Sequence, residues 1–215
     1  MDWSFVLRIV AVVVVGYLIG CISFAYISAK LFRGKDIRDV GSGNAGTANV
    51  IRNYGWGIGL VTFVGDAAKG AAAAFIGGLI VPELVTGAAP LVNFSMTDVH
   101  LGACICGMAA IIGHIWPVFL KFHGGKGVAS SLGVFLIIMP VQAAIGFGIC
   151  AVIIALTRLV SVGSLFGTML MVASSVVFYT GNWWHHATCV VLLLLVWYSH
   201  RANIKRLAEG RENTI

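Results

Sequence analysis

The sequence predicts an all-α fold, namely a polytopic membrane protein whose seven transmembrane helices form a single domain over residues 1–215. Composition is the first reason: 59% of the 215 residues are hydrophobic and only 10% are charged, whereas a soluble domain carries about 25% charged residues. The mean hydropathy of +0.96 agrees with this. Several apolar runs also reach the ~20 residues that cross a bilayer as a helix.

The expected spans follow these apolar runs along the chain, at residues 4–31, 56–81, 98–120, 127–140, 141–157, 161–180 and 183–199. The first run is longer than the apolar region of a secretory signal, so it is interpreted as a membrane helix that is not cleaved. The two runs that meet at Met139-Pro140 are short. The sequence leaves open whether they form two helices or one long segment with a kink.

Charge placement supports an odd number of spans. With the N-terminus outside, twelve of the fourteen Lys and Arg residues reach one face, whereas the opposite face receives only Arg8 and Lys69 falls inside a span. The positive-inside rule then places the basic face, together with the C-terminus, in the cytoplasm. An even number of spans would move residues 201–215 outside and break this asymmetry. The pI of 9.3 therefore reflects topology and anionic partners at one membrane face, and no basic stripe indicates a nucleic-acid partner.

All five cysteines lie in apolar runs, at Cys21, Cys104, Cys106, Cys150 and Cys189. Their spacing matches neither zinc ligands nor a redox motif. They are interpreted as small core residues, and no metal site is expected.

The first glycine-rich segment, Gly41–Arg52, follows the first span and reads GSGNAGTANVIR. Its small residues, among them Ser42, Gly43 and Asn44, let the backbone approach a ligand closely. Arg52 adds a planar guanidinium that suits phosphate or carboxylate. A flexible turn with solvated side chains has the same composition, so this segment alone does not decide between the two readings.

The second glycine-rich segment, Gly124-Gly125-Lys126-Gly127, follows a helix break expected at Pro117. It is not a nucleotide-binding P-loop, because Leu120 holds the position of the first glycine and Gly127 follows Lys126 where that motif needs Ser or Thr. Free N–H groups and the start of the next helix can still bind an anion, with Lys126 beside it.

Two ionisable residues fall inside the second span. Asp66 and Lys69 are three residues apart, which puts them on one face of a helix and allows them to pair. Such a pair is costly in a membrane and usually faces the interior of the bundle. We expect it to be largely structural, with a direct ligand contact as the alternative. His114, in the third span, is interpreted as a buried core histidine.

The end of the last span carries a polar group of residues, SHRANIKR, at Ser199–Arg206. Its basic residues suit anionic lipid headgroups. That reading does not account for His200 and Asn203, which share a helical face. Together with the two glycine-rich segments on the same membrane face, they indicate a ligand with a phosphate group that is found near lipid.

Four blocks resemble, in order and spacing, the signature blocks of the PlsY family, the acyl-phosphate:glycerol-3-phosphate acyltransferases. They read GSGNAGTANVIRNYG, GDAAKG, GHIWPVFLKFHGGKGVA and HRANIKRLAEGRE, and the resemblance covers nearly the whole chain. It implies a seven-helix enzyme of the bacterial inner membrane with its active site at the cytoplasmic face. The implied reaction moves an acyl group from acyl phosphate to the sn-1 hydroxyl of glycerol 3-phosphate, giving lysophosphatidic acid and inorganic phosphate, the first step of phospholipid synthesis.

The resemblance also implies roles for particular residues. Those expected at the reacting centre are His200, Asn203 and Ser42. Those expected around phosphate are Gly43, Asn44, Arg52, Gly124, Gly125, Lys126, Gly127 and Ser161. Because acyl phosphate is already activated, the family reaction needs no metal or cofactor, and the protein supplies positioning and charge stabilisation, as a monomer. Whether His200 or a substrate phosphate accepts the hydroxyl proton stays open.

The chain departs from the family at one place. Members usually have Gly-Ala-Thr-Asn where this chain has Gly46-Thr47-Ala48-Asn49. The hydroxyl is displaced by one residue, so the role of the family threonine is not carried over to Thr47, and Ala48 cannot perform it.

Two other classes of protein share some of these features. A transporter would also use Asp66 and Lys69, but the sequence has no inverted repeat or paired interrupted helices. A non-catalytic lipid-binding or assembly protein would explain the basic C-terminal segment but not the two glycine-rich segments.

Overall fold

The computed structural model describes residues 2–82, 84–85, 99–178 and 183–215. Its helices are α1 Trp3–Gly20, α2 Phe24–Arg33, α3 Thr47–Tyr54, α4 Trp56–Ile80, α5 Leu101–Ile115, α6 Val128–Ile138, α7 Pro140–Thr157, α8 Val160–Phe178, α9 Trp183–Ser199 and α10 Arg201–Ala208. Two 3₁₀ turns, η1 Ile37–Asp39 and η2 Val118–Leu120, and one antiparallel strand pair, β1 Leu84–Val85 with β2 Val99–His100, complete it. The expected helical fold is confirmed, and the small strand pair is an addition that the sequence did not indicate.

Five segments are long and apolar enough to cross a membrane: Trp3–Arg33, Trp56–Ile80, Leu101–Leu120, Pro140–Thr157 and Val160–Val177. The pair His186–Ser199 and Arg201–Ala208, bent by 59°, makes a sixth if it is one span. With 11 residues, α6 is about 16 Å long, shorter than the ~30 Å hydrocarbon core. The described residues therefore give five or six candidate spans, and the count of seven stays a prediction.

The segment around Met139-Pro140 forms two helices. Val128 and Ala129, near the start of α6, line the same cavity as Ala151 and Ile154, near the end of α7. The chain therefore reverses direction between them. Pro140 takes the first position of α7, where its missing N–H costs no helical hydrogen bond. Of the two readings that the sequence left open, the structure has the pair of helices.

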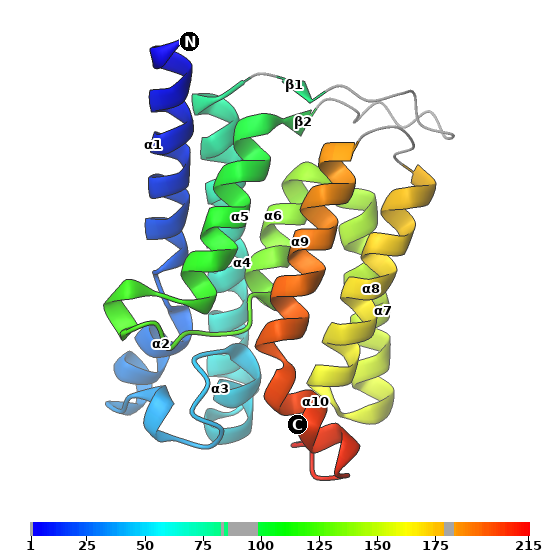
Figure 1. Ribbon diagram of the computed structural model, residues 1–215. Helices are drawn as coiled ribbons and strands as arrows, with labels where there is room; N and C mark the ends of the chain where they lie inside the picture. Colours follow the sequence, from blue (N-terminus) through cyan, green and yellow to red (C-terminus); the bar gives the residue numbers. More distant parts are fainter. Residues whose placement is uncertain (1, 83, 86–98, 179–182) are drawn as a thin grey trace.

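Small residues bring the helices into close contact. A Cβ atom added at Gly20 of α1 would lie 2.1 Å from the Ala110 carbonyl oxygen of α5, and one at Gly133 of α6 would lie 1.8 Å from the Ala67 carbonyl oxygen of α4. Only glycine permits such backbone contact, as at other membrane helix interfaces. As a result α6 is fixed against α4, and the Gly124–Gly127 segment that precedes it lies beside the end of the bundle that carries α3 and α10 (Figure 1).

Candidate active site

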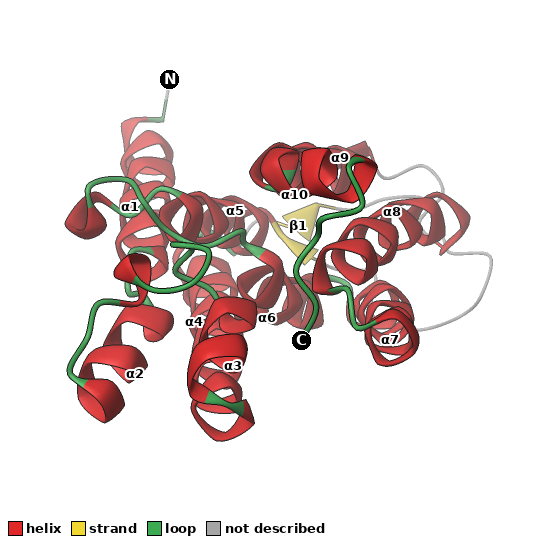
Figure 2. Ribbon diagram, turned by 90° about the horizontal axis from the view of Figure 1, so that it is seen from below, coloured by secondary structure: helices red, strands yellow, loops and turns green. Residues whose placement is uncertain are grey.

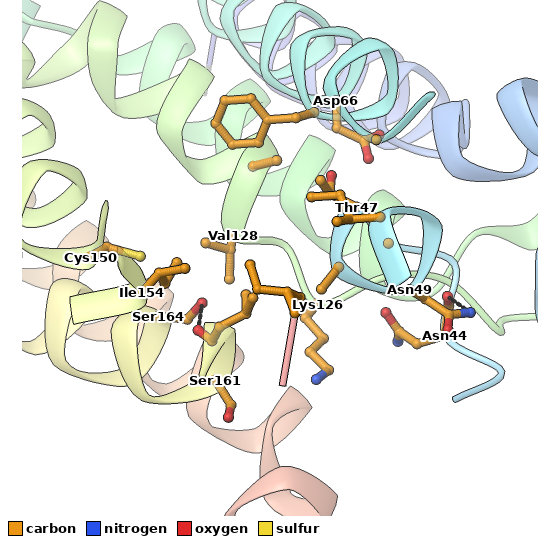
Figure 3. Close-up of a pocket in the computed structure, with 18 of the residues that line it drawn as sticks. Asn44, Thr47, Asn49, Asp66, Lys126, Val128, Cys150, Ile154, Ser161 and Ser164 are labelled. Atoms are coloured by element: carbon orange, nitrogen blue, oxygen red, sulfur yellow. Dashed lines mark hydrogen bonds between the residues drawn. The ribbon is translucent and has the colours of Figure 1, made fainter. Parts of the chain in front are cut away.

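A cavity of about 470 Å³ lies at this end of the bundle. Its polar lining residues are Ser42, Asn44, Thr47, Asn49, Arg52, Lys126, Ser161, Ser164, His200, Asn203 and Glu212, with Asp66 and His114 further in. Its apolar lining residues include Trp56, Leu60, Phe63, Leu132, Phe147, Ala151 and Ile154. Figure 3 shows the Lys126 side chain between the labelled residues Thr47 of α3 and Ser161 of α8, with its nitrogen pointing away from Thr47. The cavity thus combines a cationic, hydrogen-bonding end with an apolar interior.

Most residues that the sequence singled out line this cavity, although they come from five separate parts of the chain. They are Ser42, Asn44, Arg52, Lys126, Gly127, Ser161, His200, Asn203 and Asp66. Gly43, Gly124, Gly125 and Lys69 are not among the lining residues. Gly43 instead closes a turn: its φ is +69° and its N–H donates to the Val40 carbonyl oxygen at 3.1 Å.

The Gly124–Gly127 segment has a different role from the one expected of its first two glycines. The N–H groups of Gly124 and Gly125 donate to the carbonyl oxygens of Ile115 and His114, at 3.2 and 3.0 Å. They are therefore not free to bind an anion, because they cap the end of α5. A Cβ at Gly125 would lie 2.1 Å from His114 Nε2, which explains why glycine is required there. The N–H groups of Lys126 and Gly127 make no hydrogen bond within the described residues.

Asn49 organises the first glycine-rich segment, a function that sequence reasoning missed. This buried side chain donates through Nδ2 to the carbonyl oxygens of Val40 and Asn44, at 2.9 and 3.1 Å. Its Oδ1 accepts from the Ser42 N–H at 3.0 Å. The loop is therefore wrapped around an amide on α3, which orders Ser42 and Asn44 at the cavity. The available signal was an asparagine close to several glycines, since amides satisfy several loop groups at once.

Thr47 begins α3 and its hydroxyl faces the cavity. The Oγ1 atom is buried and has no hydrogen-bond partner among the described residues. The backbone N–H groups of Thr47 and Ala48 are also unpaired there, as expected for the first residues of a helix. A buried, unpaired hydroxyl costs about 1–3 kcal/mol, so a ligand that accepts a hydrogen bond at this point would be favoured. The displaced hydroxyl of this chain thus still borders the cavity.

Lys126 belongs to a chain of polar contacts that crosses the cationic end. Its Nζ donates to Asn203 Oδ1, and Asn203 Nδ2 donates to Glu212 Oε1 at 2.5 Å. Ser161 Oγ donates to the same carboxylate oxygen at 3.1 Å, and Arg206 Nε donates to Oε2 at 2.9 Å. Sequence reasoning gave Glu212 no role, although the residue lies inside the last quoted block.

The electrostatics of this end are dominated by burial. Burial lowers the pKa of Lys126 to about 8; Glu212 opposes this shift, and the Arg206 and Arg52 guanidiniums add to it. Lys126 is therefore mostly protonated at neutral pH but loses its charge under mildly alkaline conditions. That charge matters because charge-assisted hydrogen bonds to phosphate are about twice as strong as neutral ones.

His200 is a neutral side chain in this environment. It is 2% exposed, and burial, followed by the Lys126 charge, lowers its pKa to about 4. Its Nδ1 lies 2.8 Å from the Val196 carbonyl oxygen. A carbonyl can only accept, so Nδ1 carries the proton and Nε2 is left as an acceptor.

Asp66, Lys69 and His114 form a buried cluster at the inner end. Asp66 Oδ1 lies 2.8 Å from Lys69 Nζ, with the two side chains 1% and 3% exposed. Lys69 Nζ also donates to the Ile22 carbonyl oxygen at 2.5 Å, where α1 gives way to α2. His114 Nδ1 lies 2.9 Å from Lys69 Nζ and 3.4 Å from Asp66 Oδ1. His114 is thus a member of a polar cluster joining α4, α5 and the α1–α2 junction, and not a lone core histidine.

A family model described as glycerol-3-phosphate acyltransferase matches residues 10–210. The chain belongs to this family. Among its relatives, the glycerol-3-phosphate acyltransferase of Thermoanaerobacter sp. (strain X514) is 38% identical over 202 residues, covering 94% of this chain and 93% of the relative. That of Clostridioides difficile (strain 630) is 39% identical over 208 residues, covering 96% and 95%.

Two solved structures are also similar. The crystal structure of PlsY, an integral membrane glycerol 3-phosphate acyltransferase, in its glycerol 3-phosphate form has a TM-score of 0.81 and 33% identity, covering 96% of this chain and 95% of that one. The lysophosphatidic acid form has a TM-score of 0.79 and 31% identity, with the same coverage. The resemblance to the PlsY family that the four blocks indicated is confirmed. The chain is a membrane acyltransferase of phospholipid synthesis, which excludes the transporter and lipid-binding alternatives.

Proposed function

We propose that this protein transfers an acyl group from acyl phosphate to the sn-1 hydroxyl of glycerol 3-phosphate, producing lysophosphatidic acid and inorganic phosphate. The main support for the proposal is that a single cavity has both a polar end and an apolar interior. Lys126 and Arg52 stand at a polar end, while Phe63 and Phe147 line an apolar interior. A molecule that joins a phosphate to an acyl chain matches both parts, and glycerol 3-phosphate matches the polar end alone.

The polar end supplies contacts for phosphate. Lys126 and Arg52 provide charge, with Ser42, Asn44 and Ser161 as hydrogen-bonding neighbours. The free N–H groups of Lys126 and Gly127, before the first turn of α6, would add the favourable end of a helix dipole. Held in this way, the two reactants lose little further entropy on reaching the transition state.

The acyl transfer itself needs a proton acceptor but no covalent intermediate. The glycerol 3-phosphate oxygen attacks the acyl carbonyl carbon, a new C–O ester bond forms, and the bond between that carbon and the phosphate oxygen breaks. Inorganic phosphate leaves with the electron pair. His200 Nε2 accepts a hydrogen bond from the attacking hydroxyl and orients it. As the oxygen attacks, the hydroxyl hydrogen turns from Nε2 to an oxygen of a substrate phosphate, which takes the proton, because the second pKa of phosphate is about 6 and His200 is a weaker acceptor with a pKa of about 4.

Acyl phosphate as the donor follows from the same chemistry. Its leaving group is phosphate, for which a cationic end is already required by glycerol 3-phosphate. Stabilising the charge that develops on this leaving group is the largest contribution that fixed cations can make. The proposal assigns no step to a metal, a cofactor or an enzyme nucleophile.

We further propose seven spans, with the N-terminus outside and the cavity at the cytoplasmic face of a bacterial inner membrane, in a single domain over residues 1–215. The basic side chains of Lys30, Lys121 and Arg206 support this orientation, because they belong to the end of the bundle with α2, η2 and α10, whereas Arg8 belongs to α1 near its start. We also propose that the protein functions as a monomer.

Topology can be tested by single-cysteine labelling from outside the cell. The five native cysteines are buried, so they give little background. Cysteine introduced at Thr86, which lies outside the described residues, should react with an impermeant maleimide. Cysteine at the exposed Asn213 should react only after the membrane is opened. Equal labelling at both positions would contradict the seven-span arrangement.

The reaction can be tested on protein purified in detergent, with glycerol 3-phosphate and either acyl phosphate, acyl-CoA or acyl carrier protein. We expect phosphate release and lysophosphatidic acid formation in equal amounts with acyl phosphate only. NMR of the product should show the ester at sn-1. Equal turnover with a thioester donor would overturn the donor assignment, and an sn-2 ester would overturn the regiochemistry.

A further inference from the structure

Glu212 is a buried carboxylate at the end of the cavity where phosphate is expected. Its side chain is 4% exposed, and it accepts hydrogen bonds from Ser161, Asn203 and Arg206. An acidic group beside a phosphate site repels the ligand, so its presence requires an explanation. The reaction proposed above makes no use of it.

Other roles for Glu212 are disfavoured by its contacts. Both carboxylate oxygens already accept hydrogen bonds from protein donors, so accepting a substrate proton would break these contacts. No group of three metal-ligating side chains occurs in the described part of the chain, so Glu212 is not part of a cluster suited to a cation. Among the three contacts of Glu212, the one with Asn203 leads on to Lys126.

The contact with Glu212 determines which way the Asn203 amide faces. An ionised carboxylate only accepts hydrogen bonds, so the amide must turn its NH₂ group toward Glu212 and its oxygen away. That oxygen is the atom to which Lys126 donates. With Glu212 removed, the Lys126 ammonium alone would favour this orientation of the amide, and the Asn203 side chain would be held less firmly.

We propose that Glu212 is a positioning residue of the acyl-transfer site: its carboxylate orients the Asn203 amide, and the Asn203 oxygen in turn holds the Lys126 ammonium toward the cavity. The inference rests on the proposed binding of phosphate at Lys126. It makes Glu212 a residue that acts through another and does not itself touch substrate.

The path of the chain fixes Glu212 in this place. After α10 the tail runs alongside the start of α8 to the end of the chain (Figure 2), and the Ile215 N–H donates to the Arg158 carbonyl oxygen at 3.0 Å. The tail therefore spans from α10 to the junction of α7 and α8. A purely structural tie between these helices is the alternative that the experiment must exclude.

The charge of Glu212 provides a readout of its proximity to Lys126, and the Glu212→Asp variant described below separates positioning from a structural tie. The charged or titratable groups that face Lys126 are Arg52 from α3, His200 and Arg206 from the α9–α10 region, and Glu212 from the tail. Glu212 is the acidic member of this set and raises the pKa of Lys126, which burial and the two arginines lower. Replacing it with a neutral side chain should make Lys126 lose its proton at lower pH.

The test compares Glu212→Gln with Glu209→Gln as a matched control. Glu209 is in the same tail and pairs with Arg211 at 2.6 Å, but its side chain is 34% exposed and no hydrogen bond joins it to Asn203. For each protein, kcat/KM for glycerol 3-phosphate is measured from pH 6 to 10, with the melting temperature in detergent as the measure of folding. The alkaline limb of this pH profile is the range in which kcat/KM falls as the pH rises. Lys126→Arg shows whether Lys126 causes it, because arginine does not titrate in this range.

We expect Glu212→Gln to lose about tenfold or more in kcat/KM at pH 7 and to shift the alkaline limb down by about one pH unit, while Glu209→Gln matches the wild type. An unshifted limb would reduce Glu212 to a structural tie. A lower KM than the wild type would mean that the carboxylate competes with phosphate, which also overturns the proposal.

Glu212→Asp keeps the proposal testable if the glutamine variant does not fold. It retains the charge but is shorter by one methylene, so it should keep the position of the alkaline limb and still lose kcat/KM through poorer contact with Asn203. Wild-type kcat/KM in this variant would refute positioning. Absence of phosphate release in both the wild type and Glu209→Gln would instead reject the proposed function, independently of Glu212.

Discussion

Asn44 Nδ2 donates a hydrogen bond of 3.2 Å to the carbonyl oxygen of Gly124, across 80 residues of sequence. The Ala45 N–H donates to the same oxygen at 3.3 Å. This one carbonyl therefore joins the two glycine-rich segments, and the geometry of the polar end of the cavity depends on it. Neither segment belongs to a helix or strand at this point, so these hydrogen bonds determine how the two segments lie relative to each other.

Asn44→Asp should be more damaging than Asn44→Ala. Alanine removes one hydrogen bond worth about 1 kcal/mol, so we expect an increase of roughly fivefold in KM for glycerol 3-phosphate. Aspartate would set a carboxylate against the Gly124 carbonyl oxygen and close to the incoming phosphate, and both contacts are repulsive. Steady-state kinetics of the two variants decide the order. A fully active Asn44→Asp would contradict the placement of phosphate near this residue.

Lys126→Ala should lose at least about a hundredfold in kcat/KM, because it removes a fixed charge from the transition state. The pH dependence of the wild type follows from the pKa of about 8. The protonated form binds phosphate and is present below pH 8, so kcat/KM should fall as the pH rises through that value. In Lys126→Arg this alkaline limb should disappear even if the maximum is lower.

Near wild-type turnover in Lys126→Ala would remove the basis for a phosphate site at this residue. A thermal unfolding curve in detergent is the necessary control. Lys126 is tied to Asn203, and loss of that contact must be separated from loss of the charge.

Asp66→Ala should lower the melting temperature in detergent more than Asp66→Asn does. Alanine leaves the Lys69 ammonium unpaired in the bundle, and removing one partner of a buried ion pair costs about 3–5 kcal/mol. Asparagine can still accept a hydrogen bond from Lys69. The exposed Asp39→Ala is the matched control and should leave the melting temperature unchanged. If Asp66→Ala is as stable as the control but inactive, the cluster acts on substrate and is not primarily structural.

Thr47→Val removes the buried hydroxyl but keeps the shape of the side chain. If this hydroxyl donates to a substrate oxygen, kcat/KM should fall about three- to tenfold, while Thr47→Ser stays close to the wild type. Moving the hydroxyl, with Thr47→Ala and Ala48→Thr combined, tests whether position 47 is required in this chain. Full activity in Thr47→Val would show that the hydroxyl has no role in the reaction.

Some features of the fold and the site could be read from the sequence because they depend on local pattern. Apolar runs predict α4, α7 and α8, since a membrane helix needs little besides length and hydropathy. Asp66 and Lys69 were paired by their spacing alone. The blocks that contain Ser42, Lys126 and Asn203 were recognisable because their order along the chain is distinctive.

The remainder depends on contacts between distant residues. Nothing local indicates that Asn49 satisfies three backbone carbonyl groups, or that Gly124 and Gly125 use their N–H groups on α5. Glu212 resembles any acidic residue of a polar tail until folding brings it against Asn203 and Ser161. His114 looked like an isolated histidine, and only the packing of α4 against α5 joins it to Lys69.

His200 provides the sharpest test of the proposed reaction. As a neutral imidazole whose Nδ1 donates to Val196, it offers Nε2 to the substrate hydroxyl as an acceptor. Glutamine can offer an amide oxygen in place of Nε2, so His200→Gln should retain activity within about tenfold of the wild type, whereas His200→Ala should lose more. An acidic limb near pH 6 should persist in His200→Gln, because it belongs to the second ionisation of substrate phosphate. The pKa of about 4 keeps His200 itself from titrating there. If that limb vanishes with the imidazole and glutamine gives no rescue, His200 is the base, and the assignment of the proton to phosphate is wrong.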